Sequence, residues 1–381
     1  MKKLALTIFF DTLLLICLGL IIVLTASSTI SAIKFSDSLY LFNSHLIRVL
    51  IAIFVMIVLS FIPYEIYKSF SKPMISFAVG LLIYTLLFAP EIKGAGRWLS
   101  IAGITFQPAD IAKLILIIHL AAMLEKKSDY LYDFKNAFIP MFIWVVIVAG
   151  LILIQPNISN GLLIIAIALT MMFVGGIHFK HIFLSSAAMA LSGGAIAMLF
   201  SHSRQRILSF VNSIINGGDL NLQVKQALVS LGSGGLFGVG IGNSKQNNLF
   251  LPEAYGDFIF AILGEQLGFI GSVAVILFYL ILFIAGILIA KKAQDKFGQL
   301  LAFGITFSIA IYAFVNIAVA TGTIPTTGLP LPFISYGGTS IIFLSMGIGI
   351  LINIAILNSK KTKVVENNLT KNISLRNNFE Q

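Results

Sequence analysis

Residues 271–290 read GSVAVILFYLILFIAGILIA, an uninterrupted run without a single charged side chain. At about 1.5 Å of rise per residue, a helix of this length spans a hydrocarbon core of about 30 Å. Similar runs recur along the chain of 381 residues, of which 58% are apolar and 10% charged, with a mean hydropathy of +0.99. A soluble domain carries about 25% charged residues. The composition therefore excludes a water-soluble globular enzyme and predicts an all-α polytopic integral membrane protein.

Hydropathy predicts ten transmembrane helices along the chain. They lie near residues 4–28, 46–62, 73–89, 109–124, 136–154, 160–177, 181–201, 257–290, 299–320 and 338–358. The single cysteine, Cys17, falls in the first span, so no disulfide within the chain is expected.

The net charge of +10 is distributed unequally between the two sides of the predicted bundle. With the N-terminus in the cytoplasm, about two thirds of the Lys and Arg residues flank the cytoplasmic ends of the spans, as the positive-inside rule requires. The remaining basic residues outside the membrane are Lys34, Arg48, Lys93, Arg97, Arg204, Arg206, Lys225 and Lys245. Both termini are predicted to be cytoplasmic, and the charge indicates a membrane protein rather than a partner of nucleic acid.

The predicted organisation is one membrane domain over residues 1–358, followed by a tail over 359–381. The tail is polar, Asn-rich and basic, which predicts a disordered segment attracted to anionic lipid. Two long connections, 90–109 and 202–256, fall outside the cell, the larger between the seventh and eighth helices. Loops of this length are usually functional, so we expect the function to face outward.

The first of these loops offers an anion-binding pair and a possible ion pair. Arg97 provides a bidentate guanidinium beside the aromatic anchor Trp98, at the membrane boundary. Asp110 and Lys113 are spaced i, i+3 at the start of the fourth span. These two side chains either neutralise each other inside the bundle or bind an anionic substrate headgroup.

The second loop brings further cations, glycines and two carboxylates. Its glycine cluster between Gly232 and Gly242 either exposes backbone amides to a phosphate or serves close packing, and Arg204, Arg206 and Lys245 add charge on the same side. Asp257 lies at the mouth of the eighth span, where ionisation is costly unless it is used. It either caps the helix or acts chemically. Glu265 lies two turns deeper, as a second carboxylate or as the partner of a buried cation.

At this point the chain resembles a known family. GRWLSIAGITFQPADIAKL (96–114), GSGGLFGVGIGNSKQ (232–246), LPEAYGDFIFAILGEQLGFIG (251–271) and TGTIPTTGLPLPFISYGGTS (321–340) are similar to motifs of the SEDS family of shape, elongation, division and sporulation proteins, which includes FtsW, RodA and SpoVE. The resemblance covers nearly the whole chain. The residues 243–246 and 332–336 resemble division-type more than elongation-type members.

The resemblance implies a peptidoglycan glycosyltransferase that polymerises lipid II, an undecaprenyl-pyrophosphate-linked disaccharide peptide, into β-1,4 glycan strands. The family's essential aspartate falls on Asp257, its Arg-Trp pair on Arg97 and Trp98, and its conserved lysine on Lys113. Asp257 is then the base that deprotonates the acceptor hydroxyl. The expected ligands of the substrate are Arg97, Trp98, Lys113, Arg204, Arg206, Lys245 and Glu265.

Two departures from the family pattern affect these expectations. Asp110 stands where the family usually has a glutamate, so the reach of its carboxylate toward Lys113 is shorter. Asn157 stands where the family usually has an aspartate after the fifth span, so no acid chemistry is expected there.

No His/Cys cluster predicts a transition-metal site, although a divalent cation such as Mg²⁺ or Mn²⁺ is compatible with a pyrophosphate leaving group. The implied partners are lipid II, membrane lipid, divisome proteins and a class B penicillin-binding protein, a transpeptidase. Small residues of the eighth and ninth spans, including Gly264, Gly268 and Gly304, either offer a docking face for its single helix or serve packing within the bundle itself. The implied location is the bacterial cytoplasmic membrane, at the division septum.

Three alternatives remain open on the sequence. A lipid II flippase needs the same headgroup site, but should place polar residues along a path through the membrane. An elongation- or sporulation-type polymerase would share the chemistry. A scaffold without catalysis would not need Asp257.

Overall fold

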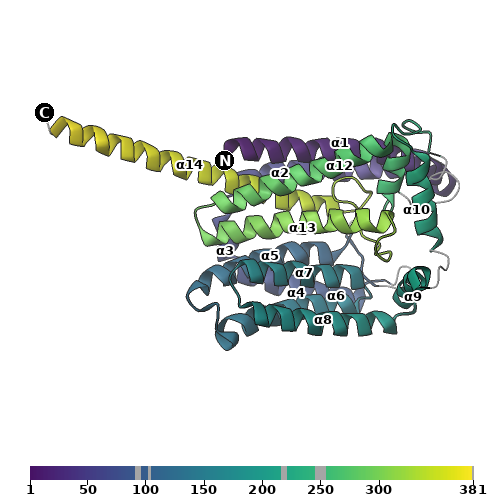
Figure 1. The fold of residues 1–381 in the computed structure, drawn as a ribbon, viewed down its shortest axis with the longest axis horizontal. Helices are drawn as coiled ribbons and strands as arrows, with labels where there is room; N and C mark the ends of the chain where they lie inside the picture. Colours follow the sequence, from purple (N-terminus) through teal and green to yellow (C-terminus); the bar gives the residue numbers. More distant parts are fainter. Residues whose placement is uncertain (91–95, 102–103, 216–220, 245–254, 380–381) are drawn as a thin grey trace.

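Long helices running alongside one another make up most of the molecule (Figure 1). The computed structural model describes residues 1–379 apart from 91–95, 102–103, 216–220 and 245–254. Each of the ten predicted spans overlaps one helix, which confirms the all-α membrane fold. These helices are α1 (Lys2–Phe35), α2 (Tyr40–Phe61), α4 (Ser71–Phe88), α5 (Pro108–Lys126), α6 (Ile139–Ile154), α7 (Ile158–Val174), α8 (Phe179–Leu199), α12 (Ile259–Lys292), α13 (Lys296–Ala320) and α14 (Ser340–Phe379).

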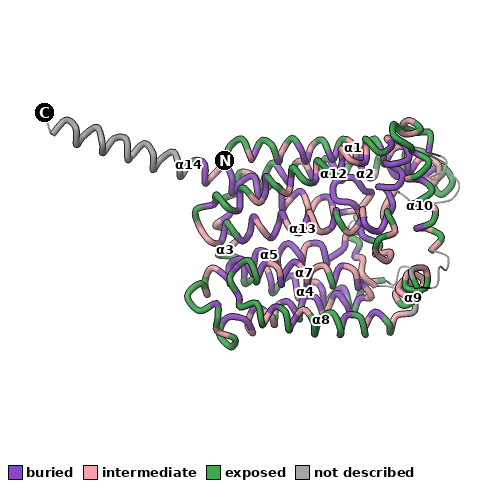
Figure 2. Tube along the Cα trace, viewed as in Figure 1, coloured by how far each residue is buried: buried purple, intermediate pink, exposed green. Residues whose placement is uncertain are grey.

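Within the described residues, eight helices are long and apolar enough to cross a membrane, and α5 and α7 fall outside that set. Helix α7 has 17 residues, and α5 carries charged residues near both of its ends. Both helices are mostly buried, and α5 packs against α4, α7 and α13 (Figure 2). They are therefore interior helices, whose length and polarity are set by protein neighbours more than by lipid.

The two ends of the bundle differ in character (Figure 1). One end holds the N-terminus and the short elements α3 (Glu65–Ser69), η1 (Ser128–Tyr130) and η2 (Phe134–Phe138). The opposite end, called here the loop end, holds α9 (Ser201–Ile215), α10 (Leu222–Ser233) and an antiparallel hairpin of β1 (Leu99–Ile101) and β2 (Ile104–Phe106), in which Leu99 pairs with Phe106. Both long connections predicted to lie outside the cell gather at this loop end.

Helix α14 continues to Phe379, where the composition predicts a disordered tail from Ser359. Disorder of the segment 359–381 stays a prediction. Residues 359–379 contain no glycine or proline, so nothing in the backbone forces the helix to stop.

The glycine loop, defined as residues 234–242, packs backbone against backbone on α12. Helix α12 is broken at Gly268, which has φ 70° and ψ −167°. A Cβ on Gly238 would lie 2.1 Å from the carbonyl oxygen of Gln266, and one on Gly234 would lie 2.1 Å from that of Gly264. Four backbone hydrogen bonds join the two segments: Val239 N to Glu265 O (2.9 Å), Gly240 N to Gln266 O (3.1 Å), Phe269 N to Gly235 O (2.9 Å) and Ile270 N to Leu236 O (3.2 Å).

This pairing decides between the two interpretations of the glycine cluster. The amides of Val239 and Gly240 already donate to carbonyls of α12, so they are not presented to a phosphate. The glycines permit a close approach of two backbones, which a side chain at Gly234 or Gly238 would prevent. The cluster therefore serves packing.

The small residues expected to form a docking face also serve the interior of the chain. Gly264 faces Leu231, Gly268 faces the backbone of Gly238, and Gly304 faces Met171 and Ile117. All three are buried. The expectation that they present a surface to another helix was wrong, because neighbouring segments of the same chain already cover them.

We predict that Gly238→Ala destabilises the protein by about 3 kcal/mol, because the residue has φ +81° and its new methyl group would collide with a carbonyl. Thermal unfolding in detergent, followed by circular dichroism, measures the effect. The control is Gly232→Ala on α10, where a Cβ would meet nothing within 4 Å. Equal unfolding temperatures for the two variants would contradict the packing described here.

Candidate active site at the loop end

An irregular segment between α13 and α14, residues 321–339, enters the bundle and organises the site. We call it the proline loop, since it contains Pro325, Pro330 and Pro332. It reaches far into the bundle, because a Cβ on Gly19, in the middle of α1, would lie 2.7 Å from the Ile334 Cα. The Tyr279 hydroxyl of α12 donates to the carbonyl oxygen of Pro332. The segment is thus a buried re-entrant loop.

Three anchors fix the start of α12 to the proline loop. The Asn316 side-chain amide donates to the carbonyl oxygens of Asp257 (2.8 Å) and Leu329 (2.7 Å). The Ser335 hydroxyl donates to Gly256 O (2.7 Å) and accepts from Leu331 N (2.8 Å), and Tyr336 N donates to Tyr255 O (2.9 Å). The backbone carbonyl oxygens of residues 255, 256 and 257 therefore each accept a hydrogen bond. These bonds fix the backbone position from which the Asp257 side chain extends.

Two arginines from separate segments converge on Asp257. Arg97 precedes β1 and Arg206 lies on α9, and the charge of Asp257 acts on both guanidinium groups. Arg206 Nη1 donates to Thr326 O over 3.4 Å. A Cβ on Gly328 would lie 3.4 Å from Asp257 Oδ2 and 3.6 Å from Arg206 Nη1. The carboxylate and the guanidinium therefore face the same side of Gly328, where the missing side chain leaves room for both.

Among the described side chains at this site, positive charge exceeds negative charge, with two guanidinium groups and one carboxylate. Burial lowers the pKa of both arginines from its ordinary value, since it disfavours the charged form, and Asp257 opposes this shift. For Arg97 the neighbouring Arg206 lowers the pKa further. Both groups remain protonated at neutral pH. The Arg97 Nε is buried, and no described residue accepts a hydrogen bond from it, so one donor of this guanidinium is left unsatisfied.

Aromatic side chains lie beside these charges. A Cβ on Gly338 would lie 3.6 Å from the Trp98 ring, so Trp98 covers the end of the proline loop. Tyr255 and Tyr336 pack edge to face, with ring centroids 5.4 Å apart. Arg48 of α2 donates from Nη1 to the Tyr336 hydroxyl over 2.9 Å.

The sequence analysis did not assign Arg48 to the site. The available signal was its position at the outer end of the predicted span 46–62, where an ionisable residue next to the membrane is costly unless it has a function.

Lys113 and Asp110 lie on α5 and are buried together. Their Nζ and Oδ1 atoms are 3.7 Å apart, and the Lys113 Nζ lies 3.9 Å from the ring centre of Tyr312. The Tyr312 hydroxyl donates to Asn160 Oδ1 over 2.6 Å. This geometry favours mutual neutralisation inside the bundle over binding of a headgroup.

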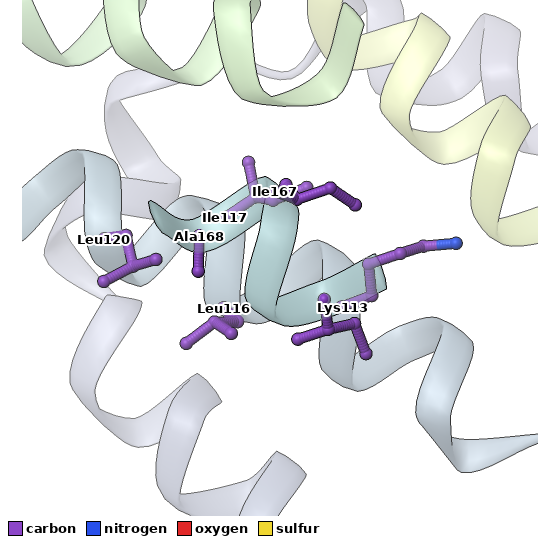
Figure 3. A pocket seen from close by; sticks show the side chains of 7 residues that line it. Lys113, Leu116, Ile117, Leu120, Ile167 and Ala168 are labelled. Carbon is purple, nitrogen blue, oxygen red and sulfur yellow. The ribbon is translucent and has the colours of Figure 1, made fainter. Parts of the chain in front are cut away.

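A shallow apolar recess adjoins Lys113, but its charged atom faces elsewhere. Figure 3 shows the Lys113 side chain extending away from the apolar side chains there. The recess is lined by Lys113, Leu116, Ile117, Leu120, Ile164, Ile167 and Ala168. It is therefore an interior gap between helices, without a polar group directed into it.

The remaining predicted site residues lie in different places. Arg204 is exposed, because it sits two residues from Arg206 on α9 and therefore points to another face. Lys245 lies outside the described residues. Glu265 is buried and accepts hydrogen bonds from the hydroxyls of Ser230 (2.9 Å) and Ser244 (2.5 Å), which places it between α10 and α12.

Comparison with known proteins identifies the fold family. The family model of the cell cycle proteins FtsW, RodA and SpoVE matches residues 5–360. The chain belongs to this family. A probable peptidoglycan glycosyltransferase FtsW of Geobacter sp. (strain M18) is 36% identical over 347 residues, covering 90% of this chain and 94% of that protein. Stage V sporulation protein E of Bacillus subtilis (strain 168) is 35% identical, with the same coverage.

Solved structures show the same fold. A chain from a peptidoglycan synthase complex described as coordinating polymerization and crosslinking superposes with a TM-score of 0.74, at 23% identity, over 92% of this chain and 97% of that one. The rod shape determining protein RodA of Thermus thermophilus superposes with a TM-score of 0.68, over 91% of this chain and 95% of that one. The resemblance read from the sequence motifs is confirmed at the level of family and fold.

For Glu265 we predict a structural role. Glu265→Ala should lower the unfolding free energy by about 2–4 kcal/mol, because two buried hydroxyls lose an acceptor. Thermal unfolding and limited proteolysis between α10 and α12 measure this. Glu265→Gln keeps an acceptor oxygen and should retain most of the stability. If Glu265→Ala is as stable as the parent, the structural role is wrong, and binding of substrate by Glu265 is favoured instead.

Proposed function

We propose that this chain is a peptidoglycan glycosyltransferase that polymerises lipid II into β-1,4 glycan strands. The observation that carries the proposal is a carboxylate, Asp257, fixed by its backbone beside two partly buried guanidinium groups at one end of a membrane bundle. The reaction needs a base and a cationic site for a lipid-linked pyrophosphate, and this site supplies both. The Geobacter relative named for this activity supports the assignment.

The proposed step is a single displacement. Asp257 accepts the proton of the acceptor C4 hydroxyl while that oxygen forms a bond to the donor anomeric carbon. The bond from this carbon to the pyrophosphate oxygen breaks, and the electron pair leaves with undecaprenyl pyrophosphate. Arg97 and Arg206 stabilise the negative charge that develops on the leaving group. Displacement from the opposite face inverts the α-linked donor to a β-linkage, and it requires one base.

The site residues do not fit a divalent cation held by protein ligands. Mg²⁺ and Mn²⁺ prefer several oxygen ligands, whereas the described side chains that converge here are one carboxylate and two guanidinium groups. The described residues contain no group of three or more His, Cys, Asp or Glu side chains with metal-site geometry. We therefore assign charge stabilisation to the arginines and derive no step through a metal.

The placement of the charged residues also bears on the alternative that the protein is a lipid II flippase. Such a transporter needs helix breaks and charges along a path through the membrane. In the described part of the chain, Arg97 and Arg206 lie with Asp257 at the loop end, and the deeper Lys113 is neutralised by Asp110. This distribution supports chemistry at one surface. A scaffold role is not supported, since it gives no reason for Asp257 to be held by three anchors.

We propose a division role at the septum, with a class B penicillin-binding protein as partner. The FtsW-named relatives support the division role, although the sporulation relative is nearly as similar. The similar chain from a synthase complex supports a crosslinking partner. A fluorescent fusion that labels the lateral wall instead of the septum would favour an elongation-type polymerase.

Asp257→Asn should fold normally and lose at least about 10²-fold in polymerisation, because an amide cannot accept the hydroxyl proton. The measurement is glycan chain formation from purified lipid II in proteoliposomes, with and without the partner. Asn316 stays paired with the backbone carbonyl of residue 257, so the thermal unfolding of the variant should match the parent. Activity within a few-fold of the parent would remove Asp257 from the role of base. Lipid II translocation without polymerisation by the parent would favour the flippase.

Gly328→Ala should lower polymerisation by about tenfold or more, because its methyl group enters the space between the Asp257 carboxylate and the Arg206 guanidinium. Gly328 also has φ +72°, so backbone strain alone must be controlled. Gly235→Ala provides this control, since Gly235 has φ +54° and open space at its Cβ position. If Gly328→Ala and Gly235→Ala have equal activity when the same fraction of each is folded, the methyl group at residue 328 does not crowd the carboxylate and the guanidinium.

A further inference from the structure

Arg48 is a cation whose charge the described protein does not balance. It lies on α2, half-buried, and its guanidinium contacts Tyr336 through the hydroxyl and the ring face, with 5.4 Å between Cζ and the ring centre. No carboxylate of the described residues forms an ion pair with it. A guanidinium that is partly removed from water without a counter-charge is costly, so this position favours an anion.

A second buried polar group lies next to Arg48. His45, one turn earlier on the same helix, is fully buried, and both of its ring nitrogens lack a hydrogen-bond partner. Its ring centre lies 5.4 Å from that of Tyr336. A buried imidazole without partners is rarely left so unless a ligand or water completes it. Arg48, His45 and Tyr336 thus form a polar cluster, which we call the α2 cluster.

The α2 cluster is connected to Asp257 but distinct from the arginines there. Arg206 contacts the proline loop at Thr326 and Gly328, whereas Arg48 contacts it at Tyr336, eight residues after Gly328. Tyr336 binds Tyr255, two residues before Asp257, through its backbone and its ring. Two cations therefore contact one loop at different residues, and both of these parts of the loop are connected to the segment that carries Asp257.

The surface of α2 suits a lipid-linked ligand. Ile47, Leu50 and Phe54 have 59%, 59% and 67% of their surface exposed, so apolar side chains lead from the lipid toward Arg48. A phosphate carried on a long hydrocarbon chain can approach the cluster sideways from the bilayer while its chain remains in apolar surroundings.

We propose that the α2 cluster binds the lipid-linked diphosphate of the acceptor substrate, while Arg97 and Arg206 bind that of the donor. This inference rests on the proposed polymerase function. The donor diphosphate is attached at the bond that breaks, so its cations must adjoin Asp257. The acceptor diphosphate is separated from the reacting hydroxyl by the length of a disaccharide, so its cation need not adjoin the Asp257 carboxylate, and Arg48 contacts the proline loop at Tyr336 rather than at Gly328.

The test separates the two substrates in one coupling reaction. A donor-only analogue of lipid II lacks the C4 hydroxyl, and an acceptor-only analogue carries a phosphonate linkage that cannot leave. Initial rates are measured in proteoliposomes of neutral lipid, with each analogue varied while the other is saturating. Arg48→Ala should raise the half-saturating concentration of the acceptor analogue by about tenfold and leave that of the donor within twofold.

Matched variants make the result specific. Arg97→Ala should raise the half-saturating concentration of the donor instead, and Arg97→Lys should recover only part of it, since a point charge does not replace a bidentate fork. Tyr336→Phe removes the hydroxyl that orients Arg48 and should change the acceptor value in the same direction as Arg48→Ala. Asn43→Ala, an exposed side chain of α2, serves as the control and should change neither value.

Direct binding distinguishes failure of this proposal from failure of the proposed function. A fluorescent acceptor analogue should bind Asp257→Asn as tightly as the parent and bind Arg48→Ala about tenfold more weakly. If the parent couples the two analogues but Arg48→Ala changes neither or only the donor value, the α2 cluster is not the acceptor site. If the effect of Arg48→Ala requires phosphatidylglycerol in the vesicles, the cluster binds bulk anionic lipid and the proposal is wrong. If the parent neither couples nor binds either analogue, the polymerase assignment itself fails.

Discussion

An irregular backbone placed inside a bundle of membrane helices must find hydrogen-bond partners within the protein, since lipid supplies none. The proline loop meets this requirement through two side chains of the surrounding helices and one of its own: Tyr279 donates to the Pro332 carbonyl, Asn316 donates to the Leu329 carbonyl, and Ser335 accepts from Leu331 N. Two of these same side chains also hold the backbone of Gly256 and Asp257. The groups that satisfy the loop therefore also fix the carboxylate, so the position of the site follows from the burial of the loop.

The electrostatic character of the site follows from this placement. A carboxylate held at the boundary between protein interior and water attracts cations, and Arg97 and Arg206 come to it from two segments that the helices bring to the same end. The two guanidinium groups exceed the charge of the single carboxylate. An excess of positive charge at a partly buried surface next to the bilayer favours lipid-linked anions over soluble ones, because the hydrocarbon chain of the ligand can stay in the membrane.

Hydropathy alone predicts the ten helices, because each needs only about 20 apolar residues and no long-range information. The sequence also singles out Asp257, Arg97 and Arg206, because they lie in or beside the two long outer connections and because Asp257 and Arg97 fall on motifs of the family. It does not reveal that Arg48 meets Tyr336, a contact across 288 positions of the chain. It leaves the role of Lys113 open, because a spacing of three residues is compatible with a pair and with a ligand. It leaves open whether the small residues of α12 and α13 face a partner helix or the bundle, because periodicity does not show which neighbour covers them.

The backbone pairing between the glycine loop and α12 has a mechanical consequence. The first part of α12, from Ile259 to Gln266, is buried and separated from the rest of the helix by the break at Gly268. Its attachment to the glycine loop is made of main-chain atoms, so a displacement of that loop at the surface moves the segment that begins beside Asp257. Because the linkage does not depend on side-chain identity, the exposed Leu236 and Phe237 are free to vary while the mechanical connection is retained, provided that the glycines remain.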